Sequence, residues 1–173
     1  MVRVDEVYAM IYKNEKKVYD ILNQLGIIYT KCSHVPVYTV HEANLLKMNI
    51  IGQQCKNLFV RNKKGDMHYL IITAHEKRID LKSLSRQTGS SGLSFASEER
   101  LMKYLGLAPG AVSPFGLIND LERHVEVFID DELKSAEYIC FHPNVNTATI
   151  SISYADFEKY LAFQENKYTY IKI

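Results

Sequence analysis

Lys56 is the first of several residues whose type and setting could do chemistry. It lies in Cys55–Val60, a segment that otherwise reads as a core strand. The simplest explanation is structural, because a lysine at a strand end can keep its ammonium group in water. The functional explanation is that the ammonium group holds a phosphate or a carboxylate as a point charge with three donors.

A second candidate segment, residues 105–116, places three glycines and two prolines between two helical patterns. Such a loop can be a tight connection in which glycine permits a positive φ. It also lets backbone N–H groups approach a ligand, and two such donors can hold a carbonyl oxygen as negative charge builds on it. The segment matches neither a phosphate-binding P-loop nor the dinucleotide GxGxxG pattern.

The third candidate is His142, which leaves a strand pattern into the polar turn Pro143–Thr147. A histidine here is often only a hydrogen-bonding turn residue. As a functional group it could orient a hydroxyl or a water molecule, because its pKa lies near neutrality. The other histidines show no HExxH or other close ligand spacing, which favours surface or core roles for them. They are His34, His41, His68, His75 and His124. With no GxSxG elbow either, neither a metal nor a covalent nucleophile is indicated.

Composition narrows the class of protein further. The 21 basic and 20 acidic side chains give a net charge of +1, which argues against a protein that coats duplex DNA. Apolar runs are too short to span a bilayer and the start lacks a signal peptide, so we expect a cytoplasmic protein that does not bind membranes. The length of 173 residues suits a single domain, 1–173. Cys32, Cys55 and Cys140 lack paired spacing and are predicted to be buried thiols.

The elements that must position these residues can be read from periodicity and capping signals. Apolar spacing predicts a helix from Asn14 to a cap at Gly26, and a turn at residues 63–66 predicts a hairpin of strands 56–62 and 67–73. Further helices are predicted at 41–48, 80–86, 97–105 and from Ser153, and further strands at 27–34, 37–40, 125–129, 136–141, 147–152 and 168–173. This irregular order favours an α+β fold with a mixed, curved sheet flanked by helices, rather than a doubly wound one.

Read in order, several segments resemble the aminoacyl-tRNA editing domains related to the insertion domain of bacterial prolyl-tRNA synthetase. They are Lys56–Phe59, Lys64–Asp66 with His68–Leu70, Leu93–Ala96, Leu105–Gly106, Pro109–Gly110, Val112–Gly116, His142–Asn144 and Asn146–Thr147. The resemblance extends from the helix at Asn14 to the helix at Ser153. It is strongest to the free-standing branch, the trans-acting prolyl-tRNA deacylases, which clear alanine mischarged onto proline tRNA.

The resemblance implies a role for each of these segments. Lys56 is expected to engage phosphate or the polar end of the acylated terminal adenosine, and backbone groups at Gly110 to stabilise the carbonyl oxygen of the tetrahedral intermediate. His142 would shape the pocket. Water would attack, positioned by the ribose hydroxyl of the substrate, so neither a cofactor nor a protein nucleophile is needed. The remaining predicted substrate-binding residues are Ser113, Asn144, Asn146, Leu45 and Leu46.

The predicted partner is the acceptor end of mischarged proline tRNA, with prolyl-tRNA synthetase as a further candidate. Local contacts to the RNA backbone could come from Arg61, Lys63, Lys64 and Lys103, which would be equally ordinary as surface residues. Another small amino acid, such as cysteine on proline tRNA, remains an alternative substrate. A non-catalytic module that binds tRNA or a synthetase is the competing class, and a metal-dependent hydrolase is disfavoured by the ligand spacing.

Overall fold

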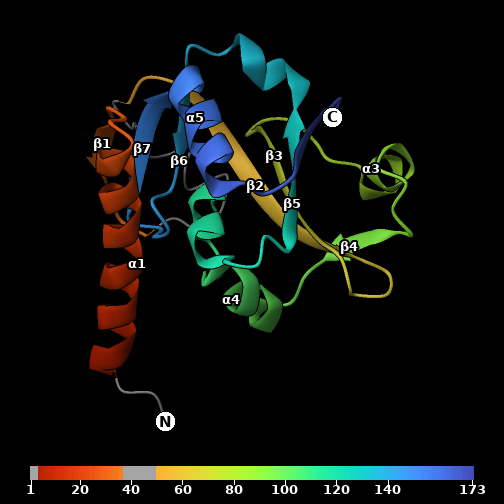
Figure 1. Cartoon of the computed structure of the whole chain (residues 1–173), viewed down its shortest axis with the longest axis horizontal. Helices are drawn as coiled ribbons and strands as arrows, with labels where there is room; N and C mark the ends of the chain where they lie inside the picture. Colours follow the sequence, from red (N-terminus) through yellow and green to blue (C-terminus); the bar gives the residue numbers. More distant parts are fainter. Residues whose placement is uncertain (1–3, 37–49) are drawn as a thin grey trace.

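The computed structural model describes residues 4–36 and 50–173 of the chain, with side chains from Tyr12 onward. Within this part a mixed sheet holds eight strands, seven of them in the order β1-β7-β6-β2-β3-β5-β8, with β4 beside β2 (Figure 1). The strands are β1 (Thr30–Ser33), β2 (Gln53–Asn62), β3 (His68–Ala74), β4 (Leu93–Phe95), β5 (Val125–Asp130), β6 (Tyr138–Phe141), β7 (Ala148–Ser153) and β8 (Tyr168–Ile171). The helices are α1 (Val4–Gln24), α3 (Leu81–Gln87), α4 (Glu98–Leu105) and α5 (Tyr154–Gln164), with the 3-10 helices η1 (Pro114–Asn119) and η2 (Asp131–Ser135).

The long strand β2 organises the sheet. One of its edges pairs along its length with β3, antiparallel, from Cys55↔Ala74 to Arg61↔His68. The other edge is shared: Gln53 and Gln54 pair with β6, in parallel, and residues 60–62 pair with β4. Among residues 4–36 and 50–173, the middle of β2 therefore has no strand partner on that edge. The predicted mixed sheet is confirmed.

The two faces of the sheet carry different cores. On one face α4, α5 and η1 pack around Phe115, Phe141, Phe157 and Tyr160 (Figure 1). On the other face a smaller cluster of Val60, Tyr69, Ile71, Leu84 and Phe128 lies under α3. Because side chains alternate along a strand, residues 55, 57 and 59 of β2 face the larger core, and residues 56, 58 and 60 face the opposite side.

Local signals located most of these elements correctly. Ser97 accepts a hydrogen bond from the Arg100 N–H at the start of α4, and Gly106 ends that helix in the left-handed region at φ +63°. Asp80 caps α3 in the same way. α1 ends near the predicted cap at Gly26 but begins ten residues before Asn14, at Val4. No helix among the residues described is long and apolar enough to cross a membrane.

Some elements differ from the expectation. β4, η1 and η2 were not predicted, and β1 is limited to four residues of the expected strand 27–34. Cys140 is buried as expected, whereas Cys32 and Cys55 are only partly buried, and all three are free thiols. The predicted strand 37–40 and helix 41–48 lie outside the described residues.

Candidate active site

One face of the sheet formed by β2, β6 and β7 is unusually polar. Register places Gln54 beside Cys140 and Cys140 beside Ser151, so their side chains share a face. Lys56 follows Gln54 by two residues and Thr149 precedes Ser151 by two, so both belong to this face. On the opposite face of the same strands, Ile139, Phe141, Ile150 and Ile152 pack into the larger core. We call this set of Gln54, Lys56, Cys140, Thr149 and Ser151 the polar face.

Lys56 lies partly buried on the polar face, opposite Thr73 of β3. Its ammonium group donates to the backbone carbonyl of Lys77. Burial lowers the pKa of Lys56, and the nearby carboxylate of Glu76 opposes that shift. The Lys56 amine thus loses solvation and forms no ion pair with a residue that the structure describes. An anionic ligand would hold it more strongly than a carbonyl does.

His142 follows β6 and lies at the end of the polar face. Its Nδ1 atom is 2.8 Å from the carbonyl oxygen of Ala148, which can only accept, so Nδ1 carries the proton. Burial lowers the pKa of His142, the hydrogen bond to Ala148 raises it, and the neighbouring His34 lowers it further. The ring is consequently neutral at pH 7, and its Nε2 atom is an acceptor that can orient a hydroxyl, an amine or a water molecule.

His34 adjoins this site, although the sequence favoured a surface or core role for it. Its ring centroid is 5.8 Å from that of His142, and its Nε2 atom is 2.9 Å from the Thr149 hydroxyl. Nδ1 is 2.9 Å from the carbonyl of Val35, so Nδ1 donates and Nε2 accepts from Thr149. No sequence spacing reveals this proximity, because strand β1 meets β7 across more than 100 residues of chain.

The loop of residues 106–116 is tied to the middle of β2 by a side chain on the larger-core face. Asn57 donates from Nδ2 to the carbonyl of Val112 at 3.1 Å, and the amide of Asn144 donates to the carbonyl of Phe115 at 3.2 Å. The hydroxyl of Tyr160 donates to the carbonyl of Pro114 at 3.0 Å. Three carbonyl groups at the C-terminal end of the loop are thus tied to β2, to the His142 turn and to α5, which anchors the loop directly after the N–H groups of Gly110 and Val112.

Those N–H groups are the part of the loop that can donate hydrogen bonds to a substrate. Gly110 has φ +84°, in the region that favours glycine, and Ala111 donates to the carbonyl of Ala108. The N–H groups of Gly110 and Val112 donate to no residue that the structure describes. A pair of fixed, uncommitted backbone donors is what stabilisation of an oxyanion requires.

The other predicted site residues have mixed placements. Ser113 is fully buried and its hydroxyl accepts from the Phe115 N–H, so it caps η1. Asn144 is buried at φ +62°, and its Oδ1 atom has no hydrogen-bond partner. Asn146 is half-buried beside it. Leu45 and Leu46 lie outside the described residues. Over 4–36 and 50–173, no group of three or more metal-ligating side chains is present.

Strand alternation places Lys56 and His142 on one face of the sheet. The Gly110 loop is tied to the same strand, β2, through Asn57, whose side chain points to the opposite face. Such an arrangement can bind an anion at Lys56, orient a polar group at His142 and accept developing negative charge at backbone N–H groups. All three functions suit hydrolysis of an activated ester, whose carbonyl needs orientation and charge stabilisation rather than a protein nucleophile.

Comparison with known proteins gives a consistent family. The model of the aminoacyl-tRNA editing domain family matches residues 34–160. The prolyl-tRNA editing protein ProX of Acetoanaerobium sticklandii is 44% identical over 152 residues, covering 88% of this chain and 93% of its own. The prolyl-tRNA synthetase associated domain-containing protein 1 of Danio rerio is 33% identical over 156 residues, covering 89% of this chain and 83% of its own.

Solved structures share the fold. One proposed to be a trans-editing enzyme for prolyl tRNA synthetase superposes with a TM-score of 0.67 at 21% identity, covering 92% of this chain and 97% of that one. The crystal structure of the hypothetical protein APE2540 superposes with the same TM-score of 0.67 at 20% identity. Both resemblances support the observed mixed sheet with its flanking helices.

Proposed function

The chain belongs to the aminoacyl-tRNA editing domain family, and on that premise we propose that it hydrolyses the ester of mischarged proline tRNA, with alanyl-tRNA(Pro) as its main substrate. The observation that carries the proposal is the polar face, where Lys56 and His142 lie on the same side of the sheet. The Gly110 loop, whose N–H groups at Gly110 and Val112 donate to no described residue, is tied to the same strand β2. Because charged tRNA is made in the cytoplasm, that is where this enzyme would act.

In the proposed reaction, water adds to the ester carbonyl carbon and the carbonyl oxygen becomes an oxyanion. The N–H groups of Gly110 and Val112 would donate to that oxyanion. Collapse of the intermediate breaks the bond between the carbonyl carbon and the ribose oxygen, which leaves protonated as a hydroxyl group. The products are free amino acid and intact tRNA, and a ribose hydroxyl of the substrate would position the attacking water.

Side chains divide the binding work in this mechanism. The Lys56 ammonium would exchange the carbonyl of Lys77 for a phosphate or polar group of the terminal adenosine, which replaces a neutral acceptor by a stronger one. The Nε2 atom of His142 would accept a hydrogen bond from the substrate and fix its orientation. Asn144 and Asn146 lie in the same turn and would complete the pocket near His142.

Discrimination by size explains why alanine is the proposed amino acid. A synthetase pocket built for proline admits a smaller side chain with only a modest loss of binding, so a second, hydrolytic site must remove the error. A small cavity in this protein would admit alanine and exclude proline sterically. Cysteine on the same tRNA is the alternative that a small cavity leaves open.

The substrate can be identified by a deacylation assay with three charged forms of proline tRNA. We expect rapid loss of alanine, slower loss of cysteine and no loss of proline. The same alanine-charged tRNA without protein gives the spontaneous rate. Equal rates with and without protein on every form would refute hydrolysis and leave a tRNA-binding module as the better description.

The role of Lys56 can be tested in the same assay. Lys56→Ala should reduce deacylation about 100-fold, because it removes a charge-assisted contact to the substrate. Circular dichroism should show an intact fold. Lys82→Ala is the matched control, since Lys82 is an exposed lysine on α3 with no ion pair among the described residues. Normal turnover by Lys56→Ala would show that Lys56 does not contribute to substrate binding.

A further inference from the structure

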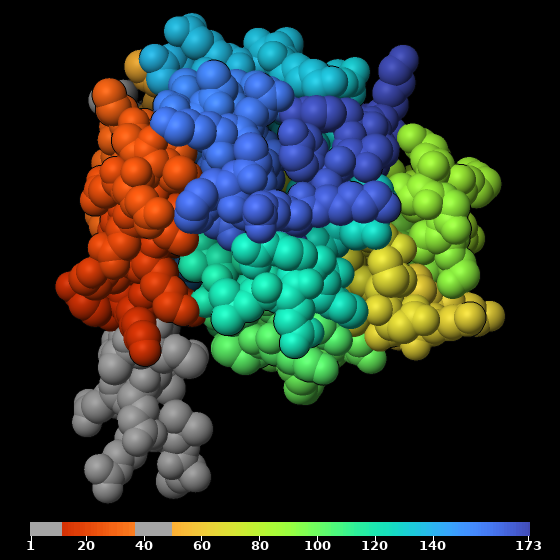
Figure 2. Space-filling view, viewed as in Figure 1, coloured from red at the N-terminus to blue at the C-terminus, as the bar shows by residue number. Residues whose placement is uncertain are grey.

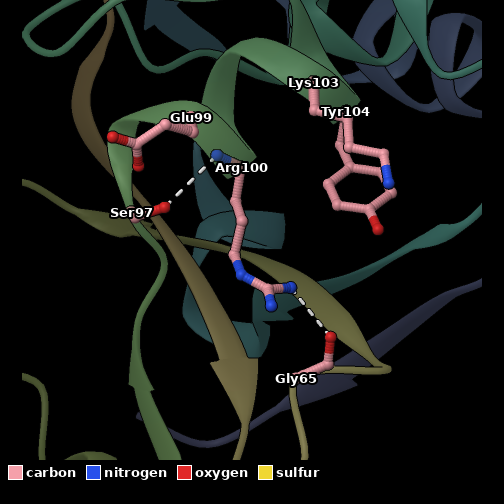
Figure 3. A pocket seen from close by; sticks show the side chains of 6 residues that line it. All are labelled: Gly65, Ser97, Glu99, Arg100, Lys103 and Tyr104. Atoms are coloured by element: carbon pink, nitrogen blue, oxygen red, sulfur yellow. Dashed lines mark hydrogen bonds between the residues drawn. The ribbon is translucent and has the colours of Figure 1, made fainter.

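A hollow of about 450 Å³ lies between α4 and the tip of the β2–β3 hairpin, outside the polar face (Figure 3). α4 and the hairpin tip are neighbours on the surface in the green and yellow regions of Figure 2. The residues that line the hollow are Gly65, Ser97, Glu99, Arg100, Lys103 and Tyr104. The proposed hydrolysis uses none of them.

Arg100 crosses the hollow towards the hairpin and is only partly engaged. Its Nη1 atom donates to the carbonyl of Gly65 at 2.8 Å and lies 2.8 Å from Nε2 of His68. Nε and Nη2 donate to no residue in the described part of the chain. A guanidinium group has five N–H donors, so three remain available for a ligand. A side chain at position 65 would crowd Nη2, since a Cβ atom there would lie 3.0 Å from it.

The buried His68, itself bonded to the partly buried His124, holds the guanidinium group in place. Arginine only donates, so Nε2 of His68 accepts, Nδ1 of His68 carries the proton, and it donates to Nε2 of His124 at 2.9 Å. His68 is fully buried, and its pKa is lowered to about 4 by burial first and then by His124, Arg100, Lys103 and Arg61. His68 is therefore neutral at pH 7, and its Nε2 atom preorganises Arg100.

Tyr104 supports a second cation. The ammonium group of Lys103 lies over its ring, 4.9 Å from the centroid, while the ring of His124 stacks on Tyr104 at 4.5 Å and that of His68 lies at 4.2 Å. The ring is occupied by these contacts, so it positions Lys103 rather than offering a platform for a nucleobase.

The charge of the hollow is positive and uncompensated. Arg61, Arg100 and Lys103 all lie close enough to His68 to affect it, and none of them joins an ion pair among the described residues. Glu99 is the only acid in the lining, and Figure 3 shows its carboxylate pointing away from the guanidinium group. The first turn of α4 adds the partial positive charge of a helix N-terminus.

We propose that this hollow binds a phosphodiester group of the tRNA backbone, at a point distant from the acylated end; the inference rests on the proposed function. Arg100 offers a planar set of donors that suits phosphate oxygens, and Lys103 adds a point charge. Along β2, Asn62 at the hairpin end lies six positions beyond Lys56, a span of roughly 20 Å. Because α4 lies on the face opposite Lys56, an acceptor arm that reaches the polar face with its 3′ end would pass the edge of the sheet to place its backbone at the hollow.

The test compares Lys103→Gln and Arg100→Gln with wild type in binding of uncharged proline tRNA at several salt concentrations. Each variant should bind on the order of tenfold more weakly, and the slope of log K against log salt should fall in magnitude by about one. Lys103 is exposed, so its variant should fold even if loss of Arg100 disturbs the histidine pair. Lys172→Gln removes the same charge from the chain end beyond β8 and should leave affinity and slope unchanged.

A second measurement separates this site from the ester site. An alanylated CCA trinucleotide has no acceptor stem, so Lys103→Gln and wild type should hydrolyse it equally, while KM for full-length alanyl-tRNA rises only in the variant. Unchanged affinity and salt slope in Lys103→Gln would overturn the proposal that the hollow binds a phosphodiester group, while leaving the proposed function standing. Failure of wild type to bind or deacylate any form would overturn both. Competition by inorganic phosphate alone, without tRNA binding, would mark the hollow as a free-phosphate site and also contradict the proposal.

Discussion

At the scale of single residues, four histidines of this protein form two close pairs that their spacing in the sequence does not indicate. His34 and His142 meet at the polar face, and His68 and His124 meet beneath α4. Each pair joins residues that are at least 50 positions apart in the chain. Lone histidines in a sequence predict none of this, because the pairing depends on strand register and on the packing of α4.

Protonation of His142 should make the deacylation rate decline at acid pH. Its pKa is lowered from the usual 6.5, so the neutral acceptor form persists through neutrality and is lost only as the pH falls below that value. We expect deacylation by wild type to be flat from pH 8 to 7 and to decline further into acid. His142→Asn should lower the rate at pH 7.5 roughly tenfold, the loss of one hydrogen bond to substrate, and abolish the decline. A pH–rate profile that is identical for both proteins would exclude this role.

His68 should make the fold itself sensitive to acid. Its pKa of about 4 in the folded chain lies below the unfolded value of 6.5, so the unfolded chain binds more protons between these limits. The contribution of His68 to the free energy of unfolding is therefore fully present above pH 6.5. After allowance for solvent screening, the free energy of unfolding falls by about 1 to 2 kcal/mol as the pH approaches 4. Urea unfolding at pH 7 and pH 4.5 measures the loss. His68→Gln, which can still accept from Arg100, should show a smaller difference between the two pH values.

At the scale of elements, the turn after β6 depends on one unusual residue. Asn144 combines a positive φ of +62° with a hydrogen bond to the carbonyl of Phe115. Asn144→Gly loses the bond but tolerates the backbone, whereas Asn144→Ala loses the bond and strains the backbone. We expect losses of stability of about 1 and about 2 kcal/mol respectively. Thermal unfolding of the two variants checks the order, and an alanine variant as stable as the glycine variant would contradict it.

The sequence identified elements wherever local chemistry defines their ends. The caps at Ser97 and Gly106 locate α4, and the polar turn at 63–66 locates the hairpin. β4 is a three-residue strand between two loops. Its only strand partner in the described part of the chain is the far end of β2, so no local pattern predicts it. The polar face was missed for a related reason: alternation shows which residues share a side, but only the parallel pairing of β2 with β6 brings Gln54 to Cys140.

The candidate site was predicted in part. The sequence singled out Lys56, the glycine-rich loop and His142, and the structure positions them around β2. Ser113, predicted to contact substrate, accepts from the N–H of Phe115 with its hydroxyl oxygen, and its role towards substrate stays a prediction. That all these groups act on one substrate stays a prediction, as does the assignment of residues 1–173 to a single domain.

At the scale of the whole molecule, near-zero net charge should restrict which nucleic acids bind. With a net charge of +1, attraction to a polyanion must come from local clusters such as Arg61, Arg100 and Lys103. We expect duplex DNA to inhibit deacylation of alanyl-tRNA at least tenfold less effectively than uncharged proline tRNA does at 150 mM salt. If duplex DNA and uncharged proline tRNA inhibit equally when compared at the same concentration of nucleotide phosphate, then general charge, rather than a defined site, governs binding.

The shared edge of β2 also bears on the order in which this molecule assembles. The β2–β3 hairpin joins neighbours through a short turn, whereas the pairing of β2 with β6 closes a loop of more than 80 residues. Local contacts form fast and distant ones pay a larger loop-closure entropy, so we expect the hairpin to nucleate and β6 to join late. In a nascent or partly folded chain, Lys56 would then be in place on the hairpin before β6 brings His142 to the polar face. The ability to cleave an ester would therefore appear only in the last step of folding.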